Sequence, residues 1–173
     1  DDGKMLFPRM WSSSQEHIDF YEAYINNGKK VKGSSHKKPS FGDNMLFFLD
    51  YQMNYMYWRY FMWNFVGRQN EFHANSPSDI FKGNWESGIK FIDDFRLGDQ
   101  DSAPDYIRNN KGKNHYYFLP LILGLIGLCF QFGGDKRGLW VTFIVFFMTG
   151  IAIVLYLNQP PYQVRERDYA YAG

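Results

Sequence analysis

Residues 139–157 form a run of nineteen residues without a charged side chain, and this run limits the possible folds more than any other feature. The run is LWVTFIVFFMTGIAIVLYL, in which only the two threonines are conventionally polar. A helix rises 1.5 Å per residue, so this run would be about 28 Å long, close to the roughly 30 Å hydrocarbon core of a bilayer. The run therefore predicts a membrane-spanning helix.

A second apolar run precedes the first. Residues 116–132, YYFLPLILGLIGLCFQF, carry no charge and reach the short end of the spanning range. Residues 133–138 separate the two runs, and Gly133 and Gly134 can end a helix in the left-handed conformation. The pair predicts a transmembrane helical hairpin; the alternative is two buried helices of a large soluble protein.

The charge of the turn predicts the orientation of this hairpin. Lys136 and Arg137 lie within a few residues of both helix ends, which favours a cytoplasmic turn. Residues 158–173 then lie on the outer side, although Arg165 and Arg167 in that tail oppose the assignment.

Residues 45–67 predict an aromatic helix, long enough to span but rich in polar side chains. On an ideal helix these fall on two roughly opposite sides: Asp50, Asn54 and Asn64 on one, Gln52 and Arg59 on the other. Such a helix either lies in the membrane interface or lines a cavity between helices. A plain lipid-facing span is the alternative.

The remaining segments are predicted to lie outside the membrane. Residues 1–44 form a polar segment, in which residues 28–40 (GKKVKGSSHKKPS) are a basic loop. Its lysines either contact anionic lipid or lipid-linked phosphate, or are simply solvated. Residues 68–115 contain many turn signals and predict an extramembrane loop with a short helix at residues 86–96.

Composition excludes several classes of function. A net charge of +1 gives no overall field to attract nucleic acid. The four histidines lack metal-ligand spacing, so no metal site and no cofactor are predicted. The single cysteine, Cys129, cannot form an internal disulfide and is expected to be a small buried side chain. Aromatic residues make up 20% of the chain, which is typical of proteins rich in membrane-interface contacts.

Three groups of residues are candidate sites. Residues 165–169 (RERDY) lie just outside a predicted span, where arginines can bind a phosphate with two hydrogen bonds each; alternatively, the opposite charges brace the loop. Asp50 and Arg59 form a second candidate, unless an interfacial helix leaves both charges in water. The adjacent acids Asp93 and Asp94 are a third, although adjacent surface acids are common.

Four strings carry a resemblance to a known family. They are MYWRYFMWNFVGRQN (56–70), GNWESGI (83–89), YYFLPLILGLIGL (116–128) and YLNQPPYQVRERDYAYAG (156–173). They resemble the bacterial multi-spanning family catalogued as domain of unknown function 2723, related to animal transmembrane protein 260, an O-mannosyltransferase. The resemblance covers about residues 39–173. It implies an α-helical integral membrane protein of the C-type glycosyltransferase fold, located in the bacterial inner membrane with several spans.

The resemblance also implies a reaction. Such enzymes move a mannose-like sugar from a polyprenyl-phosphate donor to a protein hydroxyl, so membrane lipid, lipid-linked sugar and a protein acceptor are the expected partners. The chain is expected to be a middle-to-late part of the enzyme, with the catalytic acid outside it. The residues expected to contribute to the lipid-phosphate pocket are Arg165, Arg167, Tyr169, Tyr171 and Arg59. The alternative function is a non-catalytic membrane scaffold or transport component.

Overall fold

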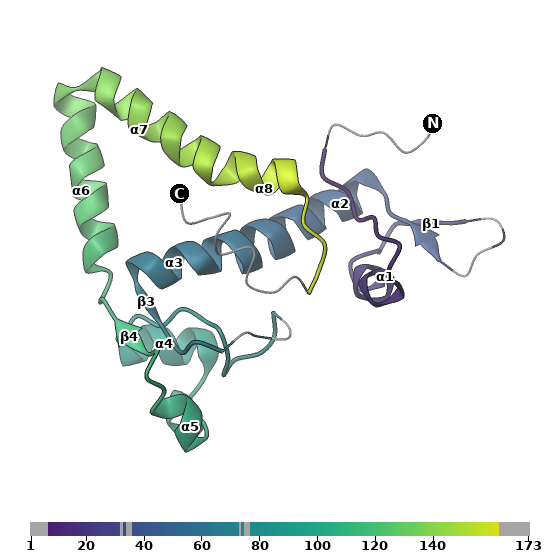
Figure 1. Ribbon diagram of the computed structural model, residues 1–173, viewed down its shortest axis with the longest axis horizontal. Coiled ribbons are helices and arrows are strands. Elements are labelled where there is room, and N and C mark those ends of the chain that lie inside the picture. Colours follow the sequence, from purple (N-terminus) through teal and green to yellow (C-terminus); the bar gives the residue numbers. More distant parts are fainter. Residues whose placement is uncertain (1–6, 32, 34–35, 73, 75–76, 163–173) are drawn as a thin grey trace. The chain divides into compact units, whose positions relative to one another are not determined.

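The computed structural model describes residues 7–31, 33, 36–72, 74 and 77–162, and most of them are helical (Figure 1). The predicted α class is therefore confirmed. The chain divides into two compact units. Unit 1 consists of residues 1–57 and 148–173, and unit 2 of residues 58–147.

Unit 1 is built around an aromatic core. Its elements are the helices α1 (Gln15–Glu22), α2 (Phe41–Phe47) and α8 (Ile151–Leu157), the strands β1 (Lys29–Lys30) and β2 (Lys37–Lys38), and most of the π-helix η1 (Phe48–Trp58). The buried Phe47 and Tyr51 rings stack at 5.2 Å, and Phe20 meets Tyr51 edge-on at 5.0 Å. Aromatic pairs at these separations add to the stabilisation from burial alone.

The predicted aromatic helix is present but begins earlier and changes its winding. It runs through α2, η1 and α3 (Arg59–Phe65). It begins at residue 41 because Ser40 and Asp43 form a reciprocal cap: the Ser40 hydroxyl accepts from the Asp43 N–H at 3.2 Å, and Asp43 accepts from the Ser40 N–H at 2.8 Å. π-Helical turns are rare and occur frequently at functional sites.

The two polar sides of this helix differ in exposure. Asp50, Asn54 and Asn64 are exposed, whereas Gln52 is buried and Arg59 is half-buried. The buried Gln52 amide donates to the carbonyl of Gln159 at 2.9 Å and to Asn158 Oδ1 at 3.2 Å. Gln52 therefore ties η1 to the segment that follows α8.

The predicted basic loop contains a short hairpin. β1 pairs antiparallel with β2, so that Lys29 faces Lys38 and Lys30 faces Lys37. All four lysines are exposed. Like charges directly opposite each other weaken a strand pair, so the fold places repulsive charges here and solvent must screen them.

Unit 2 contains the segment predicted to be an extramembrane loop, and this segment is folded. β3 (Gly67–Arg68) pairs antiparallel with β4 (Asn114–His115), and between them lie α4 (Lys90–Leu97), the 3-10 turn η2 (Gln100–Ser102) and α5 (Asp105–Arg108). Its core is partly polar. The buried amide of Asn70 donates to the Phe81 carbonyl at 2.8 Å, and that of Asn84 donates to the Asp79 carbonyl at 2.7 Å.

The short helix predicted at residues 86–96 begins four residues later, at Lys90. The cause is Asp93, whose carboxylate accepts from the backbone N–H groups of Ser87 and Gly88, each at 2.9 Å. These bonds hold the preceding residues in a turn and satisfy N–H groups that a helix would leave without partners.

The turn between the two apolar helices is tighter than predicted. α6 (Leu119–Gly134) and α7 (Lys136–Thr149) are separated by Asp135 alone. The expectation that Gly133 and Gly134 end the first helix in the left-handed conformation is wrong, since both are helical. Asp135 breaks the helix instead, and its carboxylate accepts from the Gly138 N–H at 3.0 Å to cap α7.

Among the described residues, one helical stretch is long and apolar enough to cross a membrane, Lys136–Leu157, with 22 residues. It comprises α7 and α8, between which Gly150 departs from helical geometry. α6 has 16 residues and is shorter. Cys129 on α6 is exposed, so the prediction that it is buried is wrong for this chain.

Candidate functional site

The candidate site is a group of charged side chains around β3. We call it the β3 centre; it consists of Arg59, Arg68, Glu86, Lys113 and His115. Backbone pairing assembles it, because Gly67 faces His115 and Arg68 faces Asn114 across the strands. The Glu86 N–H also donates to the Gly67 carbonyl at 3.1 Å. Three segments that are distant in the sequence therefore lie side by side.

The crossing point of these segments requires a glycine. Gly67 has a φ of 144°, a conformation that residues with a Cβ rarely adopt. A Cβ at this position would also lie 2.6 Å from the carbonyl oxygen of Asn114. The close approach of β3 to β4 thus depends on the missing side chain.

Glu86 is the buried acid of the β3 centre. Its Oε1 atom lies 2.9 Å from Lys113 Nζ and 3.2 Å from His115 Nε2. Its Oε2 atom is buried without a hydrogen-bond partner, and the same holds for His115 Nε2, which is near Oε1 but not aligned for a hydrogen bond. Burying a carboxylate is costly unless a cation lies close to it, and Lys113 supplies that cation.

Two arginines of the centre share one indole ring. The guanidinium carbons of Arg59 and Arg68 lie 5.2 and 4.7 Å from the ring centroid of the buried Trp63. Arg59 Nη1 also donates to the carbonyl of Gly83 at 2.6 Å. Cation–π contacts and this hydrogen bond hold the two guanidinium groups in fixed positions.

A third arginine lies against the same group of residues. The guanidinium carbon of Arg96 lies 3.7 Å from the Trp85 ring centroid, and Arg96 Nη2 donates to the Trp85 carbonyl. Burial lowers the pKa of Arg96 to about 10, although the nearby carboxylates of Asp93 and Glu86 oppose this shift. Arg96 therefore stays charged at neutral pH.

Buried polar atoms without hydrogen-bond partners are concentrated here. Across the residues that the structure describes there are six such atoms, and one of them, Gln52 Oε1, belongs to unit 1. The others are Trp63 Nε1, Arg68 Nε, Glu86 Oε2, Arg96 Nε and His115 Nε2. Buried polar groups are normally paired, so this concentration distinguishes the β3 centre and its neighbours from the rest of the described residues.

The sign of the charge indicates what kind of partner would fit. Arg59, Arg68, Arg96 and Lys113 outnumber the two carboxylates of Glu86 and Asp93 in this region. A net positive group containing several guanidinium groups suits an anion, and phosphate oxygens match the planar fork of arginine.

The β3 centre is attached directly to the beginning of α6. The Tyr116 N–H donates to the Val66 carbonyl at 2.8 Å, and the Tyr117 N–H donates to the Ser87 carbonyl at 3.2 Å. Figure 1 shows β3 and β4 at this end of α6. The charged group therefore lies where the polar fold meets an apolar helix.

The structure places one predicted phosphate-binding residue, Arg59, in the β3 centre. The others, Arg165, Arg167, Tyr169 and Tyr171, lie outside the described residues. Asp50 belongs to unit 1, where its Oδ2 accepts from the Tyr24 hydroxyl at 3.1 Å.

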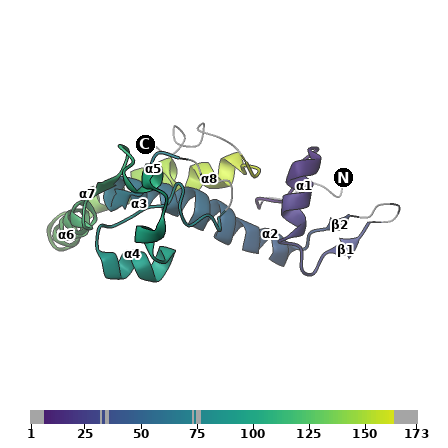
Figure 2. The ribbon, with the colours of Figure 1, turned by 90° about the horizontal axis from the view of Figure 1, so that it is seen from below.

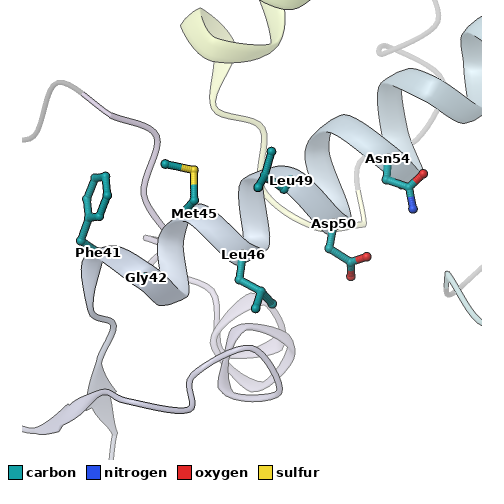
Figure 3. A pocket seen from close by; sticks show the side chains of 7 residues that line it. All are labelled: Phe41, Gly42, Met45, Leu46, Leu49, Asp50 and Asn54. Carbon is teal, nitrogen blue, oxygen red and sulfur yellow. The ribbon is translucent and has the colours of Figure 1, made fainter.

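The helix face that carries Asp50 forms a shallow apolar depression. Figure 3 shows its lining: Phe41, Gly42, Met45, Leu46, Leu49, Asp50 and Asn54. All seven belong to the continuous helix formed by α2 and η1. Because no second element contributes, polar groups do not converge on this depression as they do in a binding site.

The third predicted site, the acidic pair, has structural partners. Asp93 is buried and accepts from the backbone ahead of α4, and also from the Ser87 hydroxyl at 3.0 Å. Asp94 lies 3.4 Å from Lys90 across one helical turn. Within the described part of the chain, no group of three or more His, Cys, Asp or Glu side chains is arranged to hold a metal ion.

Four residues of the β3 centre were not predicted from the sequence: Arg68, Glu86, Lys113 and His115. No regular spacing connects them, because they meet only through the pairing of two-residue strands. The available signal was two strings of the family resemblance: GNWESGI contains Glu86, and MYWRYFMWNFVGRQN contains Arg68.

Comparison with known proteins gives one match. The model of a family of unknown function, DUF8416, matches residues 1–49. No curated protein and no solved structure matches the chain. The matched residues belong to unit 1 and fall mostly before the region that carries the resemblance described above. The chain is thus similar to a family of unknown function at its N-terminal end, and the match does not include the β3 centre.

Proposed function

We propose that this chain is part of an integral membrane glycosyltransferase, and that the β3 centre holds the phosphate of its lipid-linked donor. The donor would be a polyprenyl-phosphate sugar of the mannose type, and the acceptor a protein hydroxyl. One observation carries the proposal: a net positive group with partnerless buried polar atoms lies directly before an exposed apolar helix. The four strings that resemble a glycosyltransferase family support the reaction class.

The exposure of the apolar helices supports a membrane location. On α6, Phe130 and Phe132 are 77% and 69% exposed, and apolar side chains all round the helix face outward. Soluble proteins rarely present an apolar surface of this extent. Lipid would cover it. The bacterial inner membrane, with residues 133–138 on the cytoplasmic side, follows as the proposed location.

The chemistry assigned to this site is stabilisation of a leaving group. When the bond from the sugar to the donor phosphate breaks, negative charge develops on the phosphate oxygens. Guanidinium donors fixed on Trp63, those of Arg59 and Arg68, would stabilise that charge without reorganising. Arg165, Arg167, Tyr169 and Tyr171, which lie outside the described residues, stay separate candidates for binding the donor phosphate.

The test is a transfer assay on the complete protein in lipid nanodiscs. The donor is a radiolabelled polyprenyl-phosphate mannose and the acceptor a serine- and threonine-containing peptide; both sugar transfer and release of polyprenyl phosphate are measured. Arg68→Gln should lower kcat/KM by about 100-fold, the usual effect of losing one donor to a developing anion.

The matched control is Arg108→Gln, because Arg108 is exposed and pairs with Asp105 on the surface of α5. This variant should keep the parent rate. Turnover that survives both Arg59→Gln and Arg68→Gln would contradict the role of the β3 centre. Turnover that survives neutral replacement of Arg165 and Arg167 would show that these two arginines do not bind the donor phosphate.

A non-catalytic membrane scaffold or transport component is the second candidate. It is favoured because polar side chains of unit 2 bind the protein's own backbone and so stabilise the fold. For example, the Gln69 amide donates to the Ile80 carbonyl at 2.8 Å. A complete, folded protein that binds polyprenyl phosphate but transfers no sugar would support this candidate over the enzyme.

A further inference from the structure

α4 exposes two large apolar side chains, Phe91 and Phe95, and buries the polar Asp93 together with Leu97. Phe91 and Phe95 are 82% and 88% exposed, whereas Asp93 is 3% exposed. The two phenylalanines are four residues apart and therefore lie on one face of the helix. A helix on the surface of a water-soluble domain normally turns such large apolar side chains toward the core.

The inward face is held by specific polar contacts. Asp93 binds the Ser87 and Gly88 N–H groups, and the Arg96 guanidinium lies on the Trp85 ring. Rotating α4 to bury its phenylalanines would break these contacts and leave Asp93 without partners. The exposure of Phe91 and Phe95 therefore follows from the packing of α4.

The segment ahead of α4 is bound to the residues that lead into α6. The Trp85 and Phe118 rings meet edge-on at 6.1 Å, and the Tyr117 N–H donates to the Ser87 carbonyl at 3.2 Å. Only Gly88 and Ile89 separate this attachment from the first residue of α4. Figure 2 shows α4 at one edge of unit 2.

We infer that α4 lies in the membrane–water interface, with Phe91 and Phe95 inserted between lipid headgroups and acyl chains. This rests on the membrane location proposed for α6, whose exposed apolar surface begins only a few residues from the attachment of α4. Tyr116 and Tyr117, both exposed, lie at the junction, and tyrosine favours this depth.

The polar edge of α4 agrees with an interfacial position. Lys90 lies 2.6 Å from Asp101 and 3.4 Å from Asp94, and all three side chains are partly or largely exposed. An interfacial helix keeps such charges in the headgroup region while its apolar face enters the lipid. The exposed phenylalanines and the hydrated ion pairs of α4 fit this arrangement.

The test uses a fluorescent label on single cysteines of the complete protein in vesicles of phosphatidylethanolamine and phosphatidylglycerol. Cys129 on α6 is the native label site and reports whether α6 is in the membrane. In a Cys129→Ser background, Phe91→Cys and Phe95→Cys report on α4. Asp105→Cys on α5 is the control, because the Asp105 side chain is exposed and polar.

Quenching by lipids with a nitroxide near the headgroup or near the chain end measures depth. The label at position 91 or 95 should have blue-shifted emission and lose most intensity to the shallow nitroxide. The label at Cys129 should lose most intensity to the deep nitroxide. The label at position 105 should instead be quenched by iodide in the water phase.

The possible failures are distinguishable. If Cys129 is quenched by lipid but positions 91 and 95 behave like position 105, the inference about α4 is wrong and the membrane location stands. If labels at 91 and 95 are shielded from both lipid and iodide, protein covers α4 and the inference is also wrong. If Cys129 is not quenched by lipid, the proposed membrane location of α6 fails, and with it the inference. Circular dichroism confirms folding of each variant, and substitutions at such exposed sites normally change stability little.

Discussion

The ammonium group of Lys113 lies 2.9 Å from the buried carboxylate of Glu86. Lys113 directly precedes β4 and Glu86 precedes α4, so this ion pair connects the two segments. The Glu86 side chain is 7% exposed and that of Lys113 is 24% exposed. Removing one partner of a buried ion pair leaves the other charge uncompensated, which is more costly than replacing both.

Lys113→Met should therefore destabilise the protein by about 3–5 kcal/mol, the usual cost of breaking a buried pair. Thermal unfolding in detergent, followed by tryptophan fluorescence, measures the change. Lys113→Arg keeps the charge and should recover most of the loss. Equal unfolding midpoints for Lys113→Met and the parent would show that Glu86 does not depend on this cation.

Gly67 provides a second prediction, because its φ is positive and the carbonyl of Asn114 lies where a Cβ would be placed. Gly67→Ala should lower the free energy of unfolding by about 1–3 kcal/mol from backbone strain, with an added loss from separation of β3 and β4. Gly98→Ala is the matched control, since Gly98 also has a positive φ but no atom lies within 4 Å of its Cβ position. If the close contact with Asn114 matters, Gly67→Ala should lose more free energy of unfolding than Gly98→Ala. Equal losses would mean that backbone strain accounts for the whole effect.

The cap of α2 predicts a dependence of stability on pH. Burial alone would raise the pKa of Asp43, but hydrogen bonds from Ser40, Asn27 and Asn26 outweigh it and lower the pKa below its ordinary value of 3.8. The folded protein therefore favours the ionised form. This contribution is fully present above the pKa of the unfolded chain and is lost as the pH falls through the lower pKa of the folded state.

Unfolding midpoints measured from neutral to strongly acidic pH should show this loss, and Asp43→Asn should flatten the part of the curve that Asp43 causes. Asp105→Asn, which changes an exposed carboxylate, should leave the slope in place. A parent-like acid slope in Asp43→Asn would assign the dependence to other groups. Ser40→Ala should separately cost about 1 kcal/mol through loss of the helix cap.

The lysine hairpin predicts that a charge reversal is stabilising. Lys30 faces Lys37, so Lys30→Glu would replace a repulsive pair by an attractive one, worth about 0.2–1 kcal/mol. Hydrogen exchange at the Val31 amide, which donates to the His36 carbonyl at 3.2 Å, measures opening of the hairpin. Exchange should become slower in the variant, and high salt should reduce the difference. Faster exchange in the variant would contradict the prediction, because it would mean that repulsion between Lys30 and Lys37 does not destabilise the hairpin.

Local composition was enough to predict the apolar and aromatic helices. The apolar runs at 116–132 and 139–157 became α6, α7 and α8, and the aromatic segment at 45–67 became a continuous helix. Hydrophobic runs and helical propensity act over a few turns, so a sequence expresses them directly. Their boundaries were less predictable because Ser40, Asp43 and Asp135 set them through side-chain hydrogen bonds.

The β3 centre could not be predicted in the same way. Arg68, Glu86 and Lys113 are spread over most of the segment between α3 and α6 and are brought together by two strands of two residues each. A strand this short has no alternating pattern. Of the predicted site residues, Arg59 joined this centre, while Asp93 proved to hold the backbone ahead of α4.

By itself, the sequence determined that this chain is helical and that two of its helices are apolar all round, because both properties depend on neighbouring residues. Only the tertiary structure decided which charges meet and which phenylalanines of α4 face outward. Those outcomes depend on long-range pairing and on the cost of burying Asp93 and Glu86 without partners, and neither is encoded within any one segment.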